Sequence, residues 1–468
     1  MTRALAVGGM AGALALLVAV FASAAIAQTS PIDLQGLIDQ SSEGSTLVLE
    51  SGTYVGGVTV DKSLTITSNG DAIVDGGGVD SVFTITAADV TIDNLIIRGS
   101  GDSLDREDSG VTSIGVPRVS ITNNTFEDVL FGIFLRTAPD SLVANNDVGS
   151  KAVETARKGD GIRLWECEGT VVDNNTVTGG RDLVFWFTDR IVVSNNTVTE
   201  GRYGLHFMYS DDALIDGNNL SDNSVGAFLM YSRRTTITGN VMANNSGPSG
   251  YGLGLKDMDD VMVKDNRFIA NRIGVYLDNS PWSSDAHGWV EGNLFAYNRT
   301  GMLFLPSVSR NAMTMNTFID NSEQVGVTGS GNFTGNDWST AGVGNYWSDF
   351  AGYDADGNGV GDIPYQGQDL YNSITDNHPE LEFFQETPAA KAISLAAQMF
   401  PVLRPKPILA DESPLVERPV LAPLSISASG STTKALGFAS ILMLAVGAAA
   451  VAFPSRRRRT VPRPGVAA

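Results

Sequence analysis

Residues 191–240 read IVVSNNTVTEGRYGLHFMYSDDALIDGNNLSDNSVGAFLMYSRRTTITGN, and this stretch decides the fold. Two patterns return in it after roughly 22 residues, a period found in stacked repeats. In the first pattern, an Asn follows a short stretch of β-branched residues. In the second, Gly precedes an apolar residue, as in Gly204-Leu205 and Gly226-Ala227. Short strands and polar turns with this period are typical of the coils of a parallel β-helix.

The Asn pattern continues on both sides of this stretch. By spacing, its members are Asn124, Asn146, Asn175, Asn196, Asn219, Asn240, Asn266, Asn293, Asn316 and Asn336. An Asn side chain at an inside corner can hydrogen bond to its copies in the coils above and below. Leucine-rich repeats are the rival architecture, but their Leu framework is absent. The sequence therefore predicts an all-β fold, a right-handed parallel β-helix of about ten coils.

The two ends of the β-helix need covers, because an exposed strand edge invites association. Residues 31–40 carry Ile32, Leu34, Leu37 and Ile38 and predict a short capping helix. We expect the β-helix domain to cover residues 28–386. Helical spacing follows at 388–400, and six Pro residues lie beyond it, so residues 387–434 are predicted to be a short helix and a Pro-rich spacer.

Two apolar segments bracket the chain. Residues 1–27 have a basic start, a short apolar stretch and small residues before Gln28, which predicts a secretory signal peptide. Residues 435–454 are long enough for a transmembrane helix. Arg456 to Arg459 follow, so the tail 455–468 is expected on the cytoplasmic side. The β-helix would then lie outside the cytoplasm, anchored to the membrane by its C-terminal helix.

Charge and cysteine content restrict the partners. The chain has 31 basic and 52 acidic residues, and six of the basic residues lie in the two end segments. The remaining body therefore carries a net charge of −27, which favours cations and disfavours nucleic acid. Cys167 is the single cysteine, so an internal disulfide is excluded.

The alternation of strand residues predicts which side chains face outward. In the Gly-apolar strands, the second and fourth positions are expected inside and the third and fifth outside. One outward column then contains Arg136, Trp165, Trp186, Met208, Met230 and Lys256. His206 lies on the same face as Met208, two residues before it. Because neighbouring coils are about 4.8 Å apart, His206, Met208 and Met230 can meet at one point.

An imidazole with two thioethers is a soft ligand set that suits Cu(I). We therefore predict a copper site at His206, Met208 and Met230, with Trp186 covering the bound cation. The alternative is an apolar patch that docks a partner through Trp165, Trp186 and Phe228. Both interpretations can hold, because a protein that passes on a metal must dock its receiver. Cys167 aligns with Thr188, Ser210 and Ser232 and is interpreted as a turn residue.

A second candidate metal site is the Gly-rich loop at residues 354–362. Asp354, Asp356, Asn358 and Asp362 offer oxygen ligands at alternating positions, which suits Ca²⁺ in a structural role. The EF-hand spacing is incomplete, and a solvated turn is the alternative. The two other histidines, His287 and His378, are interpreted as surface residues.

Several segments resemble one known family. They are Gly-Asp-Gly-Ile-Arg-Leu-Trp at 159–165, Arg-Tyr-Gly-Leu-His-Phe-Met-Tyr-Ser at 202–210, Phe-Leu-Met-Tyr-Ser-Arg-Arg at 228–234, Gly-Pro-Ser-Gly-Tyr-Gly-Leu-Gly at 247–254, Gly-Val-Tyr-Leu-Asp-Asn-Ser-Pro at 274–281 and Asn-Tyr-Trp-Ser-Asp-Phe-Ala-Gly-Tyr-Asp at 345–354. These segments resemble the NosD family of nitrous oxide reductase maturation proteins, over roughly residues 30–410. The stretch 202–234 is the most specific part.

The resemblance implies a periplasmic β-helix without enzymatic activity of its own. It implies an ABC transporter, permease and ATPase, and a copper-carrying lipoprotein as partners. With them, the protein would help supply copper, and also sulfur, to the clusters of nitrous oxide reductase. The resemblance assigns no copper ligands, so the site above rests on the strand geometry alone. The rival function is a polysaccharide lyase, epimerase or glycosidase, which would need a carboxylate pair or Ca²⁺ with a basic residue in an outer groove.

Overall fold

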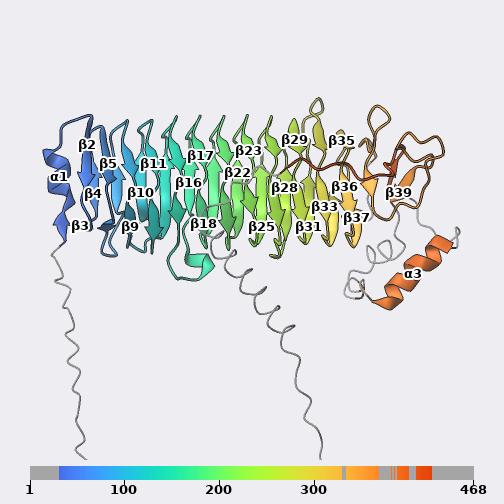
Figure 1. Cartoon of the computed structure of the whole chain (residues 1–468), viewed down its shortest axis with the longest axis horizontal. Coiled ribbons are helices and arrows are strands. Elements are labelled where there is room, and N and C mark those ends of the chain that lie inside the picture. The colour runs from blue at the N-terminus through green and yellow to red at the C-terminus, as the bar shows by residue number, and fades with distance from the viewer. Residues whose placement is uncertain are drawn as a thin grey trace, which may run out of the picture.

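The chain forms a long rod of stacked coils (Figure 1). The structure is a computed structural model and describes residues 31–328, 334–367, 381, 384, 387–399 and 407–423. Within these residues, three parallel sheets of 12, 12 and 14 strands run along the rod. Each coil contributes one strand to each sheet, as β22, β23 and β24 do in turn. This architecture confirms the predicted all-β parallel solenoid, whereas the handedness of the coil stays a prediction.

The first sheet, called the long-strand sheet here, contains 12 strands in the described part of the chain: β4 (Val58–Val60), β7 (Phe83–Ile85), β10 (Ser109–Ile114), β13 (Phe131–Arg136), β16 (Ile162–Trp165), β19 (Asp182–Trp186), β22 (Tyr203–Met208), β25 (Val225–Met230), β28 (Tyr251–Lys256), β31 (Ile273–Asp278), β34 (Thr300–Phe304) and β37 (Glu323–Val327).

The second sheet also has 12 described strands: β2 (Ser45–Leu49), β5 (Leu64–Ser68), β8 (Thr91–Asp93), β11 (Ser120–Thr122), β14 (Leu142–Ala144), β17 (Val171–Asp173), β20 (Val192–Ser194), β23 (Leu214–Asp216), β26 (Thr236–Thr238), β29 (Val261–Lys264), β32 (Gly288–Glu291) and β35 (Asn311–Thr314).

The third sheet has 14 strands among the described residues: β1 (Ile32–Asp33), β3 (Gly52–Val55), β6 (Ala72–Asp75), β9 (Ile96–Arg98), β12 (Thr125–Glu127), β15 (Asp147–Val148), β18 (Thr176–Thr178), β21 (Thr197–Thr199), β24 (Asn219–Leu220), β27 (Val241–Ala243), β30 (Arg267–Ile269), β33 (Leu294–Ala296), β36 (Thr317–Ile319) and β38 (Tyr346–Trp347).

The rod has more coils than the ten predicted. The Asn ladder begins only at Asn124, whose side-chain oxygen accepts a hydrogen bond from the backbone of Leu95 at 3.0 Å. The coils before it have no Asn at the ladder position, so the Asn spacing does not include them, although Asn94 beside that position donates to the Ser68 carbonyl at 2.9 Å. In one of them, Ser68 donates to the carbonyl of Asn94 at 2.6 Å. A corner needs a polar side chain that can bond along the stack, and residues other than Asn can supply it.

Two members of the predicted Asn ladder are wrong. Asn218, not Asn219, continues the ladder, with its Oδ1 accepting from the Asn196 backbone at 2.9 Å and its Nδ2 donating to Asn240 at 2.9 Å. Asn345, not Asn336, ends it by accepting from Asn316. The ladder position follows a residue with left-handed backbone, such as Gly217 (φ 64°), so spacing alone could not tell the two neighbours apart.

A second Asn ladder lies at the corner between the third sheet and the long-strand sheet, and sequence spacing did not reveal it. Its members hydrogen bond in sequence, each backbone amide donating to the side-chain oxygen of the next: Asn223, Asn245, Asn271, Asn298 and Asn321. All five side chains are buried. These buried amides satisfy the backbone groups that the turns would otherwise leave without partners.

Both ends of the rod are covered. Helix α1 (Leu34–Gln40) buries Leu34 and Ile38 at the first coils, as predicted, and Asp33 caps its N-terminus. At the other end, Trp347 stacks on Tyr365 with centroids 4.2 Å apart, and β39 (Tyr365–Gly367) pairs antiparallel with β40 (Leu409–Asp411). The Oδ2 atom of Asp411 accepts from the backbone of Asn345 at 2.7 Å and so completes the Asn ladder.

The segment after β40 returns along the rod over the described residues 412–423, and the role of 387–434 as a spacer stays a prediction. Leu415 bridges to Tyr346 of β38, and the carbonyl of Ala422 accepts from Arg267 of β30 at 3.0 Å. These contacts carry the segment back across the third sheet. The predicted helix is present as α3 (Pro388–Met399), and one short 3-10 helix, η1 (Thr155–Arg157), lies in the loop before β16.

Some predictions fall on residues that the structure does not describe. These are the signal peptide 1–27, the transmembrane helix 435–454, the tail 455–468 and His378. Across the described ranges, none of the helices is sufficiently long and apolar to span a bilayer.

Candidate functional site

The register predicted for the long-strand sheet is confirmed. Met208 pairs with Trp186 on one side and with Met230 on the other, and His206 pairs with Val184 and Phe228. The fourteen predicted inward residues of the strands β13 to β31 are all at most 3% exposed. His206, Met208 and Met230 therefore lie on the outer face, on two adjacent strands.

His206 is held in one orientation by its neighbours. Its Nδ1 lies 3.4 Å from Asp182 Oδ2, across a bulge between β19 and β22. Its ring meets Trp186 edge-on at 5.4 Å and Tyr203 at 5.0 Å between centroids. The side chain is only 10% exposed, and its Nε2 is buried without a hydrogen-bond partner in the described structure. A buried polar atom without a partner is uncommon and points to a missing ligand.

Asp182 is the carboxylate that positions His206, and the sequence did not single it out for this role. Arg202 holds it with two hydrogen bonds, one of them from Nε to Oδ1 at 2.9 Å. Burial alone would raise the pKa of Asp182, but the hydrogen bonds from His206 and Arg202 outweigh it and hold the pKa below its ordinary value. The residue is therefore an anion at neutral pH, and a carboxylate behind a histidine is the usual support of a metal ligand.

Met208 and Met230 are both half-buried and occupy paired positions on adjacent strands. Paired positions on neighbouring strands lie about 5 Å apart, and His206 is two residues from Met208 on the same face. The three residues therefore occupy neighbouring positions on the outer face, whereas their role as metal ligands stays a prediction. Across the described residues, no group of three or more His, Cys, Asp or Glu side chains is arranged to hold a metal. The thioethers thus distinguish this cluster from an ordinary divalent site.

Trp186 was predicted to cover a bound metal cation, and its ring lies against the guanidinium of Arg163. The guanidinium carbon of Arg163 lies 5.6 Å from the Trp186 ring and 5.8 Å from the Trp165 ring. Glu107 binds the same guanidinium at 3.1 Å. Both tryptophans are half-buried. They form a mixed aromatic and cationic surface beside His206, and one side of Trp186 is already engaged with Arg163.

Phe228, the third predicted docking residue, is also half-buried and lies between two tyrosine rings. Its centroid is 6.1 Å from Tyr203 and 6.0 Å from Tyr251, with nearly parallel planes. Stacking along the rod axis uses both of its faces, so only its edge is available to a partner. The docking role of these residues stays a prediction.

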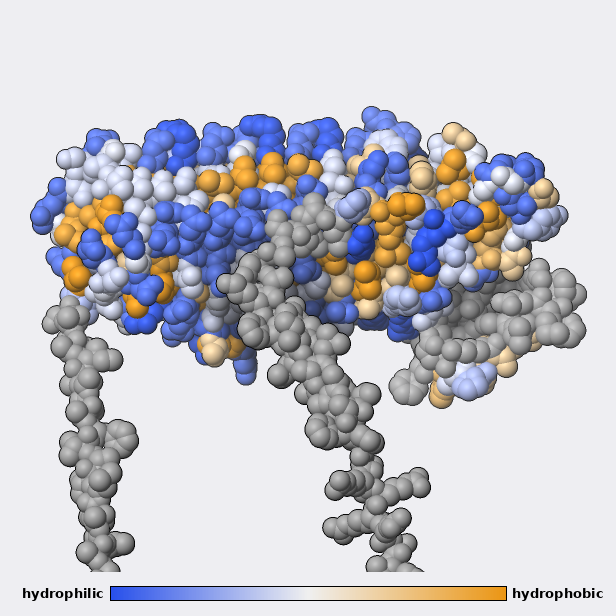
Figure 2. All heavy atoms as spheres, viewed as in Figure 1, coloured by the Kyte–Doolittle hydropathy of each residue, from blue (hydrophilic) through white to orange (hydrophobic). Residues whose placement is uncertain are grey.

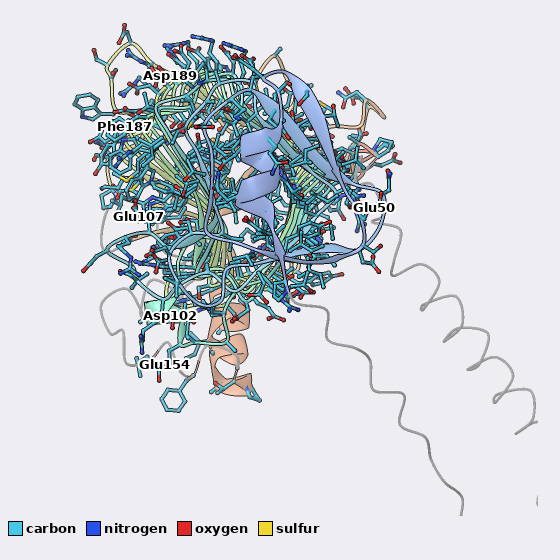
Figure 3. The ribbon with its side chains drawn as sticks, turned by 90° about the vertical axis from the view of Figure 1, so that its left-hand side faces the viewer. Glu50, Asp102, Glu107, Glu154, Phe187 and Asp189 are labelled. Carbon is cyan, nitrogen blue, oxygen red and sulfur yellow. The ribbon has the colours of Figure 1, made fainter. Side chains whose placement is uncertain are left out.

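An aromatic ladder, exposed at Phe187 and Tyr209 and half-buried at Tyr231, directly follows the outer strands and was not predicted from the sequence. Phe187, Tyr209 and Tyr231 stack with centroids 5.2 and 5.0 Å apart. Each has a left-handed backbone, with φ of 53°, 52° and 56°, a conformation that bulky side chains rarely adopt. Figure 3 shows Phe187 pointing away from the rod at one corner, near Asp189, with Glu107 further along the same side. The sequence does contain a signal for this ladder: aromatic residues recur at turn positions, where Asn or Gly is usually favoured.

Cys167 is a corner residue, as interpreted from the sequence. Its side chain is fully buried, and its Sγ lies 3.3 Å from the carbonyl oxygens of Leu135 and Trp165. Thr188 accepts from its backbone amide, and Ser210 and Ser232 continue the corner. Burial raises the pKa of the Cys167 thiol to about 11. A neutral buried thiol is inert and is a poor metal ligand.

The Asp-rich loop satisfies its carboxylates internally. Asp354 accepts from the backbone amides of Gly357 at 2.7 Å and Gly359 at 2.8 Å, and Asp362 accepts from Ala355 at 2.6 Å. Asp356 pairs with the Asn358 amide. This pattern is that of a turn built on Asp side chains. The Ca²⁺ interpretation stays a prediction. His287 is exposed, 6.2 Å from Trp289 between ring centroids.

Three acids lie near the outer column of the long-strand sheet, Asp160, Asp182 and Glu166, and they are not placed as an open pair. Asp160 and Asp182 are both buried, at 7% and 2% exposure. Burial and the nearby Asp182 charge raise the pKa of Asp160 to about 7. Glu166 is exposed and accepts from Thr137 at the turn after β16. Burial keeps the two aspartates away from a polymer in a groove.

The fold and the outer face of the long-strand sheet together define the class of protein. It is an elongated parallel β-helix whose outer sheet presents aromatic residues, two methionines and a histidine that is held by a carboxylate. The chain belongs to the NosD family. It is 32% identical over 415 residues to the probable ABC transporter binding protein NosD of Pseudomonas aeruginosa, covering 85% of this chain and 94% of that protein. The protein of the same name from Stutzerimonas stutzeri is 30% identical and is covered to 92%.

The family model described as "Periplasmic copper-binding protein (NosD)" matches residues 145–352, which include every residue of the histidine–methionine cluster. Among solved structures, the A-module of mannuronan C-5 epimerase AlgE6 from Azotobacter vinelandii is similar, with a TM-score of 0.52 and 15% identity. The matched region covers 65% of this chain and 92% of that module. This similarity shows a shared β-helix fold and nothing about activity.

Proposed function

We propose that this protein is an extracytoplasmic accessory factor that binds Cu(I) through His206, Met208 and Met230. It receives the ion from a copper-carrying lipoprotein and passes it on for the cluster assembly of nitrous oxide reductase, beside the permease and ATPase of an ABC transporter. The family description and the names of the relatives support the copper and transporter parts of this proposal.

One observation carries the proposal: His206 has one ring nitrogen beside a carboxylate and the other buried without a partner, next to two paired methionines. Asp182 favours the tautomer that leaves Nε2 as the ligand atom, and Arg202 fixes Asp182. Two thioethers and one imidazole favour Cu(I) over Mg²⁺, Ca²⁺ or Zn²⁺.

Handover needs no covalent chemistry on this chain. Cu(I) exchanges one thioether or imidazole for a ligand of the receiver, so its charge and oxidation state stay the same. Because Nε2 is buried while the methionines are half-buried, we expect the ion to enter and leave through the thioethers. Trp165 and Trp186 lie beside that route and would contact the receiving protein. Sulfur supply, which the family likeness also suggests, would use other partners of the same pathway.

The experiment is a Cu(I) competition titration against a chromophoric chelator, without oxygen and under reducing conditions. We expect the double variant His206→Ala, Met208→Ala to lower the affinity by about 100-fold or more, because it removes two of three ligands. The matched control is His287→Ala, Met315→Ala, an exposed histidine and a 43% exposed methionine away from this face. Unchanged affinity in the first variant would reject the site.

A further inference from the structure

A groove lies at the corner between the long-strand sheet and the second sheet. It has a volume of about 710 Å³ and is lined by Asp189, Tyr209, Asp211, Tyr231, Ser232, Arg233, Asp257, Asp259, Trp282 and Ser283. This volume is within the range of ordinary ligand sites. No ligand of the proposed copper site lines the groove, although Tyr209 and Tyr231 directly follow the two methionines.

The groove follows the rod axis because its walls are columns of stacked turns. In one column, the Asp211 amide donates to Asp189 Oδ1 at 2.8 Å, the Arg233 amide donates to Asp211 Oδ1 at 3.1 Å, and Arg233 bridges to Asp259. Four successive coils, each about 4.8 Å from the next, give a length of about 14 Å. An extended segment of about four residues fits that length, at roughly 3.3 Å per residue.

Aromatic rings form the other wall and one end. Tyr231 stacks on Tyr209 with one face, and Asp257 takes the place of an aromatic ring in the next coil. Trp282, which is 66% exposed, projects from the loop before β32. The hydroxyls of Tyr209 and Tyr231 form no hydrogen bond in the described part of the chain. Aromatic faces and edges are thus open to a ligand along the groove.

The charge of the groove is negative, with four carboxylates against one guanidinium. Asp211 is neutralised by Arg233 at 2.8 Å, and Asp259 is satisfied by the amides of Trp282 and Ser283. Asp189 has no ion pair among the described residues, and its Oδ2 accepts no hydrogen bond from them. Asp257 accepts from the Asn279 amide at 2.6 Å and lies 3.7 Å from the Nζ of Lys256, which Asp278 binds more closely at 2.8 Å. Asp189 and Asp257 lie at opposite ends of the groove. A cationic side chain would find a carboxylate and an aromatic ring at either end, the pair that binds guanidinium and ammonium groups.

We propose that this groove docks an extended segment of a partner protein through lysine or arginine side chains that bind Asp189 and Asp257 between Tyr231 and Trp282. The inference is independent of the copper proposal, because the groove contains no copper ligand. A neutral sugar could also stack on the aromatic rings, but four carboxylates around one guanidinium favour a cation.

The test uses the full-length protein and a fluorescein-labelled peptide, Gly-Arg-Ala-Ala-Ala-Arg-Gly, whose two Arg are about 13 Å apart when extended, in an anisotropy titration at physiological ionic strength. We expect Asp257→Asn with Trp282→Ala to weaken binding about tenfold, because one ion pair and one cation–aromatic contact are lost. The matched control Asp147→Asn with Trp289→Ala removes the same groups outside the groove and should leave binding unchanged. Both pairs are exposed or partly exposed, and Asp189→Asn with Trp282→Ala is a second groove variant.

Three outcomes would overturn the proposal. The peptide could fail to bind at all. The control pair could weaken binding as much as the groove pair, which would mean attraction by the general negative charge. Maltopentaose could bind in the groove and lose affinity in the groove variants while the peptide does not. A peptide with Glu in place of both Arg should not bind.

Discussion

The first and the middle coils of the long-strand sheet share an interior but differ outside. In β4, β7 and β10 the outward positions in register are Thr59, Thr84 and Thr112. In β16 to β25 the same column reads Arg163, Val184, His206 and Phe228. The inward neighbours are almost fully buried in both regions, and all but Ser113 of β10 are apolar. Threonine is favourable on the solvated face of a strand. The Arg, His and Phe of the middle coils therefore replace a residue type that would serve folding equally well. The interior thus specifies the rod, and the outer face of a few coils specifies what it binds.

The largest effect is expected from the loss of a buried corner Asn, which tests whether the interior specifies the rod. Asn218→Ala deletes hydrogen bonds to Asn196, Val193 and Asn240, all between 2.9 and 3.0 Å. Several buried polar groups would lose partners, so we expect the free energy of unfolding to fall by about 4 kcal/mol. Denaturant unfolding measures it, while the Cu(I) affinity of the folded fraction should be unchanged. Asn219→Ala, one residue on, should cost less than about 1 kcal/mol. Equal losses would reject the ladder assignment.

The next effect concerns Asp160, a buried acid of the middle coils that lies directly before Gly161 and β16. The pKa of Asp160 is about 7 when folded, against an ordinary value of 3.8. Between these values the folded protein holds a proton that the unfolded chain has lost. The free energy of unfolding therefore decreases as pH rises, by about 2 to 3 kcal/mol from pH 5 to pH 7. Asp160→Asn should remove this part of the pH dependence in unfolding curves. If the variant keeps the same slope, Asp160 is already ionised at pH 5.

A smaller effect tests whether the outer face is organised for a ligand. Asp182→Asn keeps the shape but removes the charge behind His206. We expect Cu(I) affinity to fall about tenfold, because the imidazole loses its preferred tautomer and its electrostatic support. The control Asp173→Asn changes another hydrogen-bonded acid, which accepts from Ser194 and Asn195 on the second sheet. If both variants bind Cu(I) as the wild type does, Asp182 has no positioning role.

The smallest effect is expected at Cys167, whose buried side chain lies at the corner after β16. Cys167→Ser replaces the thiol with the hydroxyl that Ser210 and Ser232 provide at the same corner. The free energy of unfolding should change by less than about 1 kcal/mol, and Cu(I) affinity should not change. Calorimetry and the chelator titration measure the two quantities. A large loss of copper affinity would instead identify Cys167 as a ligand.

The sequence predicts the repeat well because the same pattern of buried apolar residues returns in each coil. The inward alternation fixed the register from β13 to β31, and with it the outward column that joins Met208 to Met230. The corner residues were less predictable, since Asn218 and Asn219 differ only in which one follows a left-handed glycine. Asp182 could not be found as the partner of His206, because a bulge between β19 and β22 brings together residues that the simple alignment separates.

The docking surfaces were predictable only in part. Trp165 and Trp186 were expected outside and are there, but the sequence could not show that Arg163 already lies against both rings. The groove depends on Trp282, which comes from the loop between β31 and β32. Most of the surface visible in Figure 2 is hydrophilic, with apolar residues gathered in separate patches, and hydropathy alone does not rank such patches.

Asp411 closes the Asn ladder from a point 66 residues beyond Asn345. A chain that emerges N-terminus first can stack its early coils onto α1 at once, but its last coil waits for a carboxylate that arrives much later. Until then the terminal amides stay open to solvent or to another copy. A truncation before residue 411 should therefore leave the backbone amide of Asn345 without its acceptor and the last coil without its cover.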